Sequence, residues 1–485
     1  MCGFHQKTYS RTLGLFFCFI VIYLPNIYYY KNCIPNINIM KAIKLTLFLT
    51  LILSAGILQA QSLWTYFTPA DFAARRAKVM EKIGDGVAIL QGAELTEAYI
   101  KFRQDNNFYY LTGVEFPSSV LILNGKTKTA TLLVPEGRFA DIKDEALIKP
   151  GPDAAKEYQM TSVLPKSAMT NLLANLAAGG QTFYVVTSPD ETAEMSRDRC
   201  VALRNTRLSD PWDGRISKET NFMNKIKERF PLVMVKSLTP TLDTMRWVKD
   251  AKEIAVIKEC GKIGAHGFDE AMRVTRPGIY EYQVVAACDF VYQNEGAMGP
   301  SYFPIAASAE RGLSWHYNAN NHTIKAGDVM MMDYAPELNY YSTDITRTWP
   351  VEGKFTEKQL AMYNCIKDAS EQVIAAMKPG ITIAQMNDIA KQVYAKHGFE
   401  KYFPGGIGHY VGMAVHDVGP HEKPFVPGVV FNVEPIIEDK DMKIHLRIED
   451  TIIITETGAI NATAATPTDP ESMYKLIKEK GIGEK

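Results

Sequence analysis

The second half of the chain repeats itself, and this internal repeat constrains the fold more than any other feature. One amphipathic helical stretch from Asp250 ends in a Pro-Gly-Ile turn at Pro277, and a later one ends in the same turn at Pro379, 102 residues further on. A second helical stretch follows each turn, over residues 282–293 and 384–397. Two matching units of this kind predict two α/β halves related by a pseudo-twofold axis.

Each half also carries two acidic residues in the same order. Asp333 and Glu434 each stand six residues after a glycine, at the end of an apolar β-type run. Asp344 and Glu449 each open a later β-type run. A single Asp after a buried strand is more often a turn residue than a ligand. The same layout twice indicates that the four carboxylates converge on a shared centre.

Histidines accompany these acids. His316 precedes the first strand-end acid by 17 residues, and His416 precedes the second by 18. A further histidine, His409, lies in the glycine-rich segment 405–419, where glycines allow the backbone to approach a ligand closely. Only one of these imidazoles is needed to complete a ligand set with the four acids.

Four buried carboxylates would repel one another strongly unless cations neutralise them. The predicted ligands are Asp333, Asp344, His409, Glu434 and Glu449, which suit two divalent cations with some carboxylates bridging. Oxygen-rich ligation favours Mn²⁺, with Co²⁺, Fe²⁺ or Zn²⁺ as alternatives. Two such ions can activate a bridging hydroxide that attacks an amide. The expected catalytic residues are His316 and His416, as hydrogen-bond donors to the substrate, and Glu434, as a general base.

At these residues the chain resembles the metallopeptidase family of aminopeptidase P, prolidase and methionine aminopeptidase. The motifs are MMDYAPELNYYSTDITRTWPV, GIGHYVGMAVHDVG, NVEP and LRIED. The resemblance implies a pita-bread catalytic domain in which Asp344 and Glu449 bridge two ions. It places His409 and Glu434 on one ion and Asp333 on the other. It also implies substrate roles for His316 and His416.

The resemblance extends to the first half. The segment RQDNNFYYLTG, which starts at Arg103, and the following linker are similar to the N-terminal domain of aminopeptidase P and prolidase. Methionine aminopeptidase lacks that domain and is disfavoured. Short β-type runs alternate with helical stretches here, which predicts a mixed α/β fold. We expect Arg103–Gly113 to be a polar turn leading into an aromatic strand, and Leu238–Asp243 to be a linker.

Some positions depart from the family pattern. Gly405 stands where the family often has a histidine that shapes the proline pocket, and Pro435 is not followed by the usual glycine. Prolidases carry a longer segment between the two glutamates, with an arginine that binds the dipeptide carboxylate. Here this segment is 15 residues long and its only arginine is Arg447, although Lys440 or Lys443 could take that role.

The first 60 residues have a different character. Residues 40–60 comprise Met40, two lysines, an apolar run and a small residue at Ala60, which is typical of a secretory signal peptide. We expect residues 1–39 to be an upstream extension that is not translated in the natural protein. One alternative is that the signal-like segment is an uncleaved N-terminal anchor. Another is that residues 1–39 contain a second hydrophobic anchor. The mature protein is expected to be periplasmic or secreted, without a stable membrane span.

The full domain prediction has an N-terminal domain at 62–245, a pita-bread domain at 246–460 and a surface tail at 461–485. The fold class is α/β, in the broad sense that includes α+β. The formal net charge of −1 gives no indication of nucleic-acid binding. A homo-oligomer, either a dimer or a tetramer, is expected.

The predicted function is hydrolysis of the bond between an N-terminal residue and a following proline, by a metal-bridged hydroxide in an exported enzyme. The substrate is then a peptide with proline at its second position. One alternative is an Xaa-Pro dipeptidase (prolidase). The other is a pita-bread protein that binds peptides without cleaving them.

Overall fold

A computed structural model describes residues 66–96, 100–136, 148–189, 191 and 196–483 of the chain. Contacts divide the chain into residues 1–65 and a unit from Tyr66 to Lys485, and the second unit is described by itself. The expected upstream extension and signal peptide lie outside the described residues. Within the described part, no helix is both long and apolar enough to span a bilayer.

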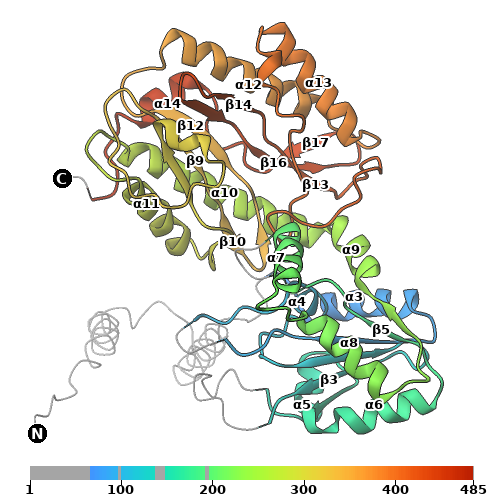
Figure 1. Cartoon of the computed structure of the whole chain (residues 1–485). Coiled ribbons are helices and arrows are strands. Elements are labelled where there is room, and N and C mark those ends of the chain that lie inside the picture. Colours follow the sequence, from blue (N-terminus) through green and yellow to red (C-terminus); the bar gives the residue numbers. More distant parts are fainter. Residues whose placement is uncertain (1–65, 97–99, 137–147, 190, 192–195, 484–485) are drawn as a thin grey trace, which may run out of the picture. The chain divides into compact units, whose positions relative to one another are not determined.

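The N-terminal domain is a mixed sheet with helices packed on it (Figure 1). Its helices are α3 (Pro69–Lys82), α4 (Asn106–Thr112), α5 (Pro152–Glu157), η3 (Lys166–Ala168), α6 (Met169–Ala178), α7 (Arg197–Ser209), α8 (Lys218–Arg229) and α9 (Thr239–Trp247). Its strands are β1 (Val87–Gln91), β2 (Val120–Asn124), β3 (Thr129–Val134), β4 (Ser162–Pro165), β5 (Phe183–Val185) and β6 (Val235–Ser237). The strand order is β4-β3-β2-β1-β5-β6, with antiparallel pairs at the centre and parallel pairs outside.

Strands of the C-terminal domain lie between two helix pairs (Figure 1). Its helices are α10 (Ala251–Val274), α11 (Glu281–Asn294), η4 (Ala309–Leu313), α12 (Glu357–Ala376), α13 (Ile383–Lys396), η5 (Glu400–Tyr402) and α14 (Pro470–Leu476). Its strands are β7 (Gly299–Pro300), β8 (Ile305–Ser308), β9 (Val329–Asp333), β10 (Pro336–Leu338), β11 (Tyr341–Ser342), β12 (Thr346–Pro350), β13 (Val430–Val433), β14 (Ile436–Asp439), β15 (Ile444–Arg447), β16 (Asp450–Ile454) and β17 (Ala459–Asn461).

The expected internal duplication is present in the backbone. The N–H of Gly278 donates to Ile324 O at 2.9 Å, and the N–H of Gly380 donates to Phe425 O at 2.8 Å. These two glycines have φ values of 94° and 95°, a region that glycine adopts readily and other residues do not. After each turn the second helix begins with a capping box closed by a glutamine, Gln283 or Gln385.

The segment 103–113 differs from its prediction, because it forms helix α4 where an aromatic strand was expected. Asp105 caps the helix by accepting the N–H of Phe108 at 2.9 Å, and Gly113 ends it in the left-handed region. Every residue of α4 is buried. A continuous apolar run carries no periodicity, so it does not distinguish a buried helix from a buried strand.

The predicted linker at 238–243 is also helical. It forms the start of α9, with Pro240 in the first turn, where the missing N–H of proline costs nothing. Asp250 then begins α10 with a capping box closed by Glu253. The two domains are therefore joined by consecutive helices.

Residues 461–485 were expected to be a surface tail, but the described part of this segment packs on the domain. Met473 in α14 is fully buried, and the hydroxyl of Tyr474 accepts the N–H of Phe355 at 3.2 Å. The carbonyl of Thr466 accepts a hydrogen bond from the buried Arg347 at 2.9 Å. A segment rich in Thr, Ala and Pro thus supplies backbone acceptors for a buried guanidinium.

Candidate metal centre

Two antiparallel strand pairs carry the predicted ligands to one place. Asp333 is the last residue of β9, where it pairs with Thr346 of β12, and Asp344 stands two residues before that strand. In the second half, Glu434 directly follows β13 and Glu449 directly precedes β16. An isolated bridge between Thr346 and Glu449 joins the two strand pairs, so the four acids meet at one seam.

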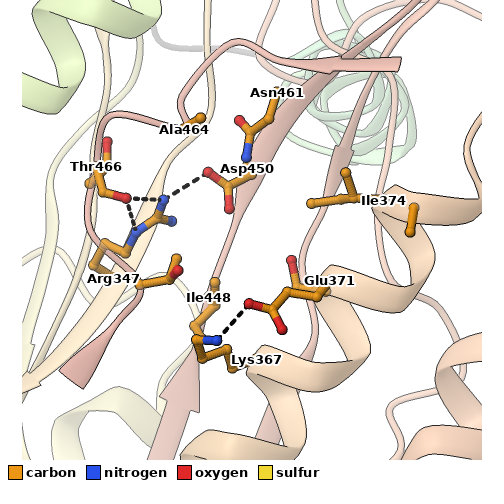
Figure 2. A pocket seen from close by; sticks show the side chains of 12 residues that line it. Arg347, Lys367, Glu371, Ile374, Ile448, Asp450, Asn461, Ala464 and Thr466 are labelled. Carbon is orange, nitrogen blue, oxygen red and sulfur yellow. Dashed lines mark hydrogen bonds and ion pairs between the residues drawn. The ribbon is translucent and has the colours of Figure 1, made fainter. Parts of the chain in front are cut away.

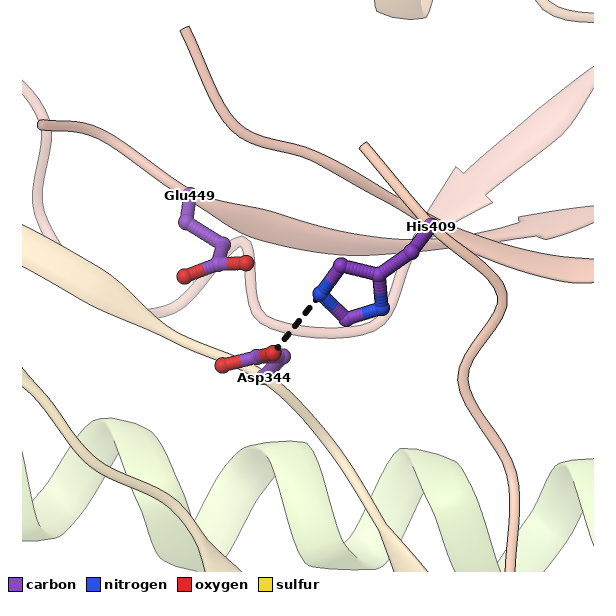
Figure 3. A group of neighbouring side chains, drawn as sticks. All are labelled: Asp344, His409 and Glu449. Carbon is purple, nitrogen blue, oxygen red and sulfur yellow. Dashed lines mark ion pairs between the residues drawn. The ribbon is translucent and has the colours of Figure 1, made fainter. Parts of the chain in front are cut away.

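The five predicted ligands fall into two overlapping groups. Ligand atoms of Asp344, His409 and Glu449 all lie within 4.8 Å of one another, as do those of Asp333, Glu434 and Glu449. Figure 3 shows the first group, in which Nε2 of His409 lies 3.4 Å from a carboxylate oxygen of Asp344. Glu449 belongs to both groups, as expected of a bridging ligand. Glu434 is grouped with Asp333, whereas the family resemblance had placed it with His409.

The tautomer of His409 suits a ligand. Its Nδ1 lies 3.1 Å from its neighbour's carbonyl, Tyr410 O, so Nδ1–H donates there and Nε2 keeps its lone pair. Burial lowers the pKa of His409, which favours the neutral form that binds cations. Asn432 contacts the same histidine twice: its Oδ1 accepts the backbone N–H of His409, and its Nδ2 lies 2.7 Å from Nε2 of the imidazole.

The electrostatics of the cluster suit bound cations. Burial and the neighbouring carboxylates raise the pKa of Asp344 to about 8 and raise the pKa of Glu434 and of Glu449. The single hydroxyl proton of Tyr302 faces Asp333 at 2.8 Å and Asp344 at 2.7 Å, so it serves only one carboxylate at a time. These observations and the oxygen-rich donor set fit divalent cations.

Arg447 is the one arginine, among the described residues, that pairs with the side-chain carboxylates of the cluster. Its Nη1 lies 2.5 Å from Asp333 Oδ2 and 3.3 Å from Glu434 Oε1, and its Nη2 donates to Trp315 O. The guanidinium is buried, so it neutralises part of the carboxylate charge from inside. It is not exposed to receive the terminal carboxylate of a dipeptide.

The two further histidines border the centre. The ring of His416 packs on the ring of His409 with centroids 3.7 Å apart. Its Nδ1 lies 3.5 Å from Asp198 Oδ2, and this contact holds the pKa of Asp198 well below its usual range. His316 is exposed, and its Nδ1 contacts Nη2 of Arg199. Partial burial of its ring and the charge of Arg199 nevertheless lower the pKa of His316.

Several residues of the site were not predicted from the sequence. They are Tyr302, Thr346, which donates to Glu449 Oε2 at 2.6 Å, Asn432, which donates to Glu449 Oε1, and the α7 residues Asp198 and Arg199. Asn432 and Thr346 each lie two residues from a predicted ligand, on the same face of a strand, and that spacing was a usable signal. No sequence signal points to Tyr302 or to α7.

A pocket of about 370 Å³ beside Arg347 contains none of these ligands (Figure 2). Its charged side chains are already paired, Arg347 with Asp450 at 2.7 Å and Lys367 with Glu371 at 2.5 Å. Arg347 also donates to the carbonyl of Glu449 at 2.6 Å. The residues of this pocket therefore stabilise the backbone at the seam of the two halves.

Comparisons with known proteins agree with the geometry in indicating a metallopeptidase. Residues 255–456 match the model of metallopeptidase family M24, and residues 72–185 match that of the aminopeptidase P N-terminal domain. An Xaa-Pro aminopeptidase of Escherichia coli K12 is 29% identical, covering 84% of this chain and 97% of the relative. Human Xaa-Pro aminopeptidase 3 is 27% identical, covering 84% of this chain and 86% of the relative.

Solved structures agree in fold. Escherichia coli aminopeptidase P with the inhibitor Pro-Leu matches with a TM-score of 0.69 at 25% identity, covering 85% of this chain and 98% of that chain. Pseudomonas aeruginosa aminopeptidase PepP matches with a TM-score of 0.71 at 24% identity, with the same coverage.

Proposed function

Because this chain belongs to the aminopeptidase P and prolidase family of pita-bread metallopeptidases, we propose that it removes the N-terminal residue from peptides whose second residue is proline. It is a metallo-aminopeptidase by its relatives and by both of its matched domains. The observation that carries the proposal is the set of four carboxylates and one imidazole at the seam of the two halves, in which Asp333, Asp344 and Glu449 are buried and Glu434 and His409 are half-buried.

The proposed ligands are Asp333, Asp344, His409, Glu434 and Glu449. Glu449, which belongs to both ligand groups, would be shared between two ions, and the family resemblance gives Asp344 the same role. When bound, two divalent cations lower the pKa of water and polarise the scissile carbonyl. The predominance of carboxylate oxygens supports Mn²⁺ as the preferred ion. Tyr302 and Asn432 orient these side chains by hydrogen bonds.

The chain's own residues position the peptide and move protons. His316 and His416 border the ligand cluster, which suits both to hydrogen-bond the reacting peptide, His316 as a donor to the carbonyl oxygen as negative charge develops there. Glu434, whose pKa is raised by burial, is the proposed general base. Arg447 holds Asp333 and Glu434 in place during these steps.

An aminopeptidase on longer peptides is favoured over a dipeptidase. A prolidase needs a cation free to bind the carboxylate that follows proline, but Arg447 is buried and bonded to the ligands. Lys440 and Lys443 are exposed in the turn between β14 and β15, and Lys440 pairs with Glu438 at 3.6 Å. The relatives named Xaa-Pro aminopeptidase support the same choice.

The test uses the protein expressed without residues 1–60 and loaded with Mn²⁺. We expect release of the first residue from Xaa-Pro-Xaa tripeptides, weak activity on Xaa-Pro dipeptides, and a metal content near two ions per chain by mass spectrometry. Xaa-Ala-Xaa is the matched control for proline. Cleavage of the dipeptide alone would assign a prolidase, and no cleavage of any substrate with metal bound would assign a peptide-binding protein.

We also propose that the protein is exported after cleavage at Ala60 and forms a homo-oligomer. The signal-like composition of residues 40–60 supports export. Mass spectrometry of the protein from cell envelope and medium fractions tests this, since an N-terminus before Met40 would contradict it. Light scattering of the purified protein measures the oligomeric state.

A further inference from the structure

The first turn of α7 belongs to the N-terminal domain but contacts both histidines beside the metal centre. The N–H of Arg197 donates to His416 O at 3.2 Å, and Asp198 Oδ2 lies 3.5 Å from His416 Nδ1. The next residue, Arg199, directs Nη2 to His316 Nδ1. Two consecutive residues thus contact the two imidazoles that are proposed to meet the substrate.

This turn is anchored by a chain of ion pairs that leads into the interior. Arg197 pairs with Glu191 and with Asp243, and Glu191 in turn pairs with Arg246 at 2.7 Å. Arg246 then binds Asp417 at 2.6 Å, and Asp417 is the residue next to His416. The start of α7 and the His416 backbone are therefore held in one network, which does not depend on the side chains of Asp198 or Arg199.

The chemistry of the two contacts fixes opposite tautomers. A guanidinium offers only donors, so Nδ1 of His316 must accept and its proton must lie on Nε2. A carboxylate offers only acceptors, so Nδ1 of His416 must carry a proton and donate to Asp198. His316 consequently presents an N–H at Nε2, whereas neutral His416 presents a lone pair there.

We propose that Asp198 and Arg199 are positioning residues, which set the tautomer and ring orientation of His416 and His316 for peptide cleavage. The proposal rests on the proposed function. Both side chains are exposed, with Asp198 65% accessible, so neither contributes a buried contact to the fold. An acid in the first turn of a helix can also stabilise the helix, by about 0.3–1 kcal/mol, but that effect would change only stability.

The experiment compares Asp198→Ala and Arg199→Ala with Arg207→Ala, an exposed arginine of the same helix. All are made in the Mn²⁺-loaded protein without residues 1–60. We expect kcat on an Xaa-Pro-Xaa tripeptide to fall about 10–100-fold in the two test variants, as for other residues that orient catalytic side chains. We expect KM, Tm and metal content to stay near the wild-type values, and Arg207→Ala to retain full kcat. Added guanidinium should restore part of the kcat of Arg199→Ala, and Asp198→Glu part of the lost kcat of Asp198→Ala.

A second readout is independent of turnover. Nitrogen-15 NMR of labelled histidines reports which ring nitrogen carries the proton, and we expect His316 to lose its fixed Nε2–H form in Arg199→Ala. If wild type is inactive but this tautomer shift occurs, the proposed function fails and the positioning stands. If wild type is active and both variants keep kcat within twofold, or raise only KM, the positioning proposal is overturned.

Discussion

The two halves of the C-terminal domain share a backbone plan but use it differently. In the first half β8 pairs along β9, so that Ala307 lies opposite Met331. In the second half the segment around His409 pairs along β13 in the same register, with the N–H of Asn432 donating to His409 O at 2.9 Å. The cross-strand pair Ala307–Met331 in one half therefore corresponds to His409–Asn432 in the other.

The two pairs differ in chemistry and in task. Ala307 and Met331 are buried in an apolar cluster with Ile305. His409 and Asn432 face the carboxylates, and Asn432 donates to Glu449. The duplicated scaffold supplies matched acids from both halves, while only the second half supplies a nitrogen ligand and its orienting amide. A repeat thus fixes where side chains point, and substitutions in each copy decide what they do.

The largest effect is expected where the halves are equivalent. Glu449→Ala removes the carboxylate that belongs to both ligand groups, and Asp344→Ala removes the acid that corresponds to it in the first half. We expect either change to lower kcat/KM by ~10³-fold or more, about 4 kcal/mol of transition-state stabilisation. Each should leave the fold intact, because removing one of several repelling buried acids relieves repulsion in the metal-free protein.

The matched control is Glu352→Ala, an exposed carboxylate just after β12. Tripeptide kinetics and circular dichroism measure the outcome. Substantial turnover by Asp344→Ala would show that this residue does not join two ions and that the halves are not equivalent in catalysis.

The second prediction separates the two cross-strand pairs. Met331→Ala empties a buried site and should cost about 2–5 kcal/mol of unfolding free energy, with metal affinity of the folded protein kept. Asn432→Ala should weaken metal binding about 10–100-fold, because His409 and Glu449 lose their orienting partner. Chemical denaturation and metal titration of both variants provide the measurements. Equal losses of metal affinity in the two variants would contradict the division of tasks.

Much of this centre followed from the sequence, because acids at strand ends are placed by the backbone. The pairing of Asp333 with Thr346 and the bridge from Thr346 to Glu449 bring those acids together whatever the neighbouring side chains are. The orienting residues did not follow in the same way. Tyr302 reaches the ligands from a loop before β8, and only the three-dimensional structure brings it there.

The misread segments have a common physical cause. Helix α4 is buried all round, so its aromatic run gave no period to distinguish a helix from a strand. The C-terminal segment looked like a polar extension, but its Thr466 carbonyl is an acceptor for Arg347. In both cases tertiary contacts outweighed the local composition.

The third prediction concerns the metal-free protein, in which both halves contribute unneutralised acids. Burial raises the pKa of Asp344 to about 8 and also raises the pKa of Glu434 and Glu449, while unfolded carboxylates titrate near about 4. Between about pH 4 and 8 the native state therefore binds more protons than the unfolded state. Its unfolding free energy must fall as the pH rises through this range. Added Mn²⁺ at 100 times its Kd should restore about 2.7 kcal/mol.

Thermal unfolding across this pH range, with and without Mn²⁺, measures both the pH dependence of stability and the stabilisation by the metal. Asp344→Ala should flatten the metal-free pH dependence, whereas Glu352→Ala should not change it. A metal-free Tm that rises between pH 5 and 8 would mean that the acids are not clustered as described.

The smallest effect tests the symmetry of the two turns. Gly278→Ala and Gly380→Ala each place a side chain at a φ near 95°, and neither position has a neighbouring atom that a methyl group would meet. Only backbone strain then opposes the change, so each should cost about 1–3 kcal/mol, and the two costs should agree. Both turns make the same hydrogen bond to the carbonyl of a facing segment, which gives no reason for one to be weaker. Chemical denaturation gives the unfolding free energy of each variant. Losses that differ by more than the contribution of one such hydrogen bond, about 1 kcal/mol, would show that the two copies no longer share one backbone plan.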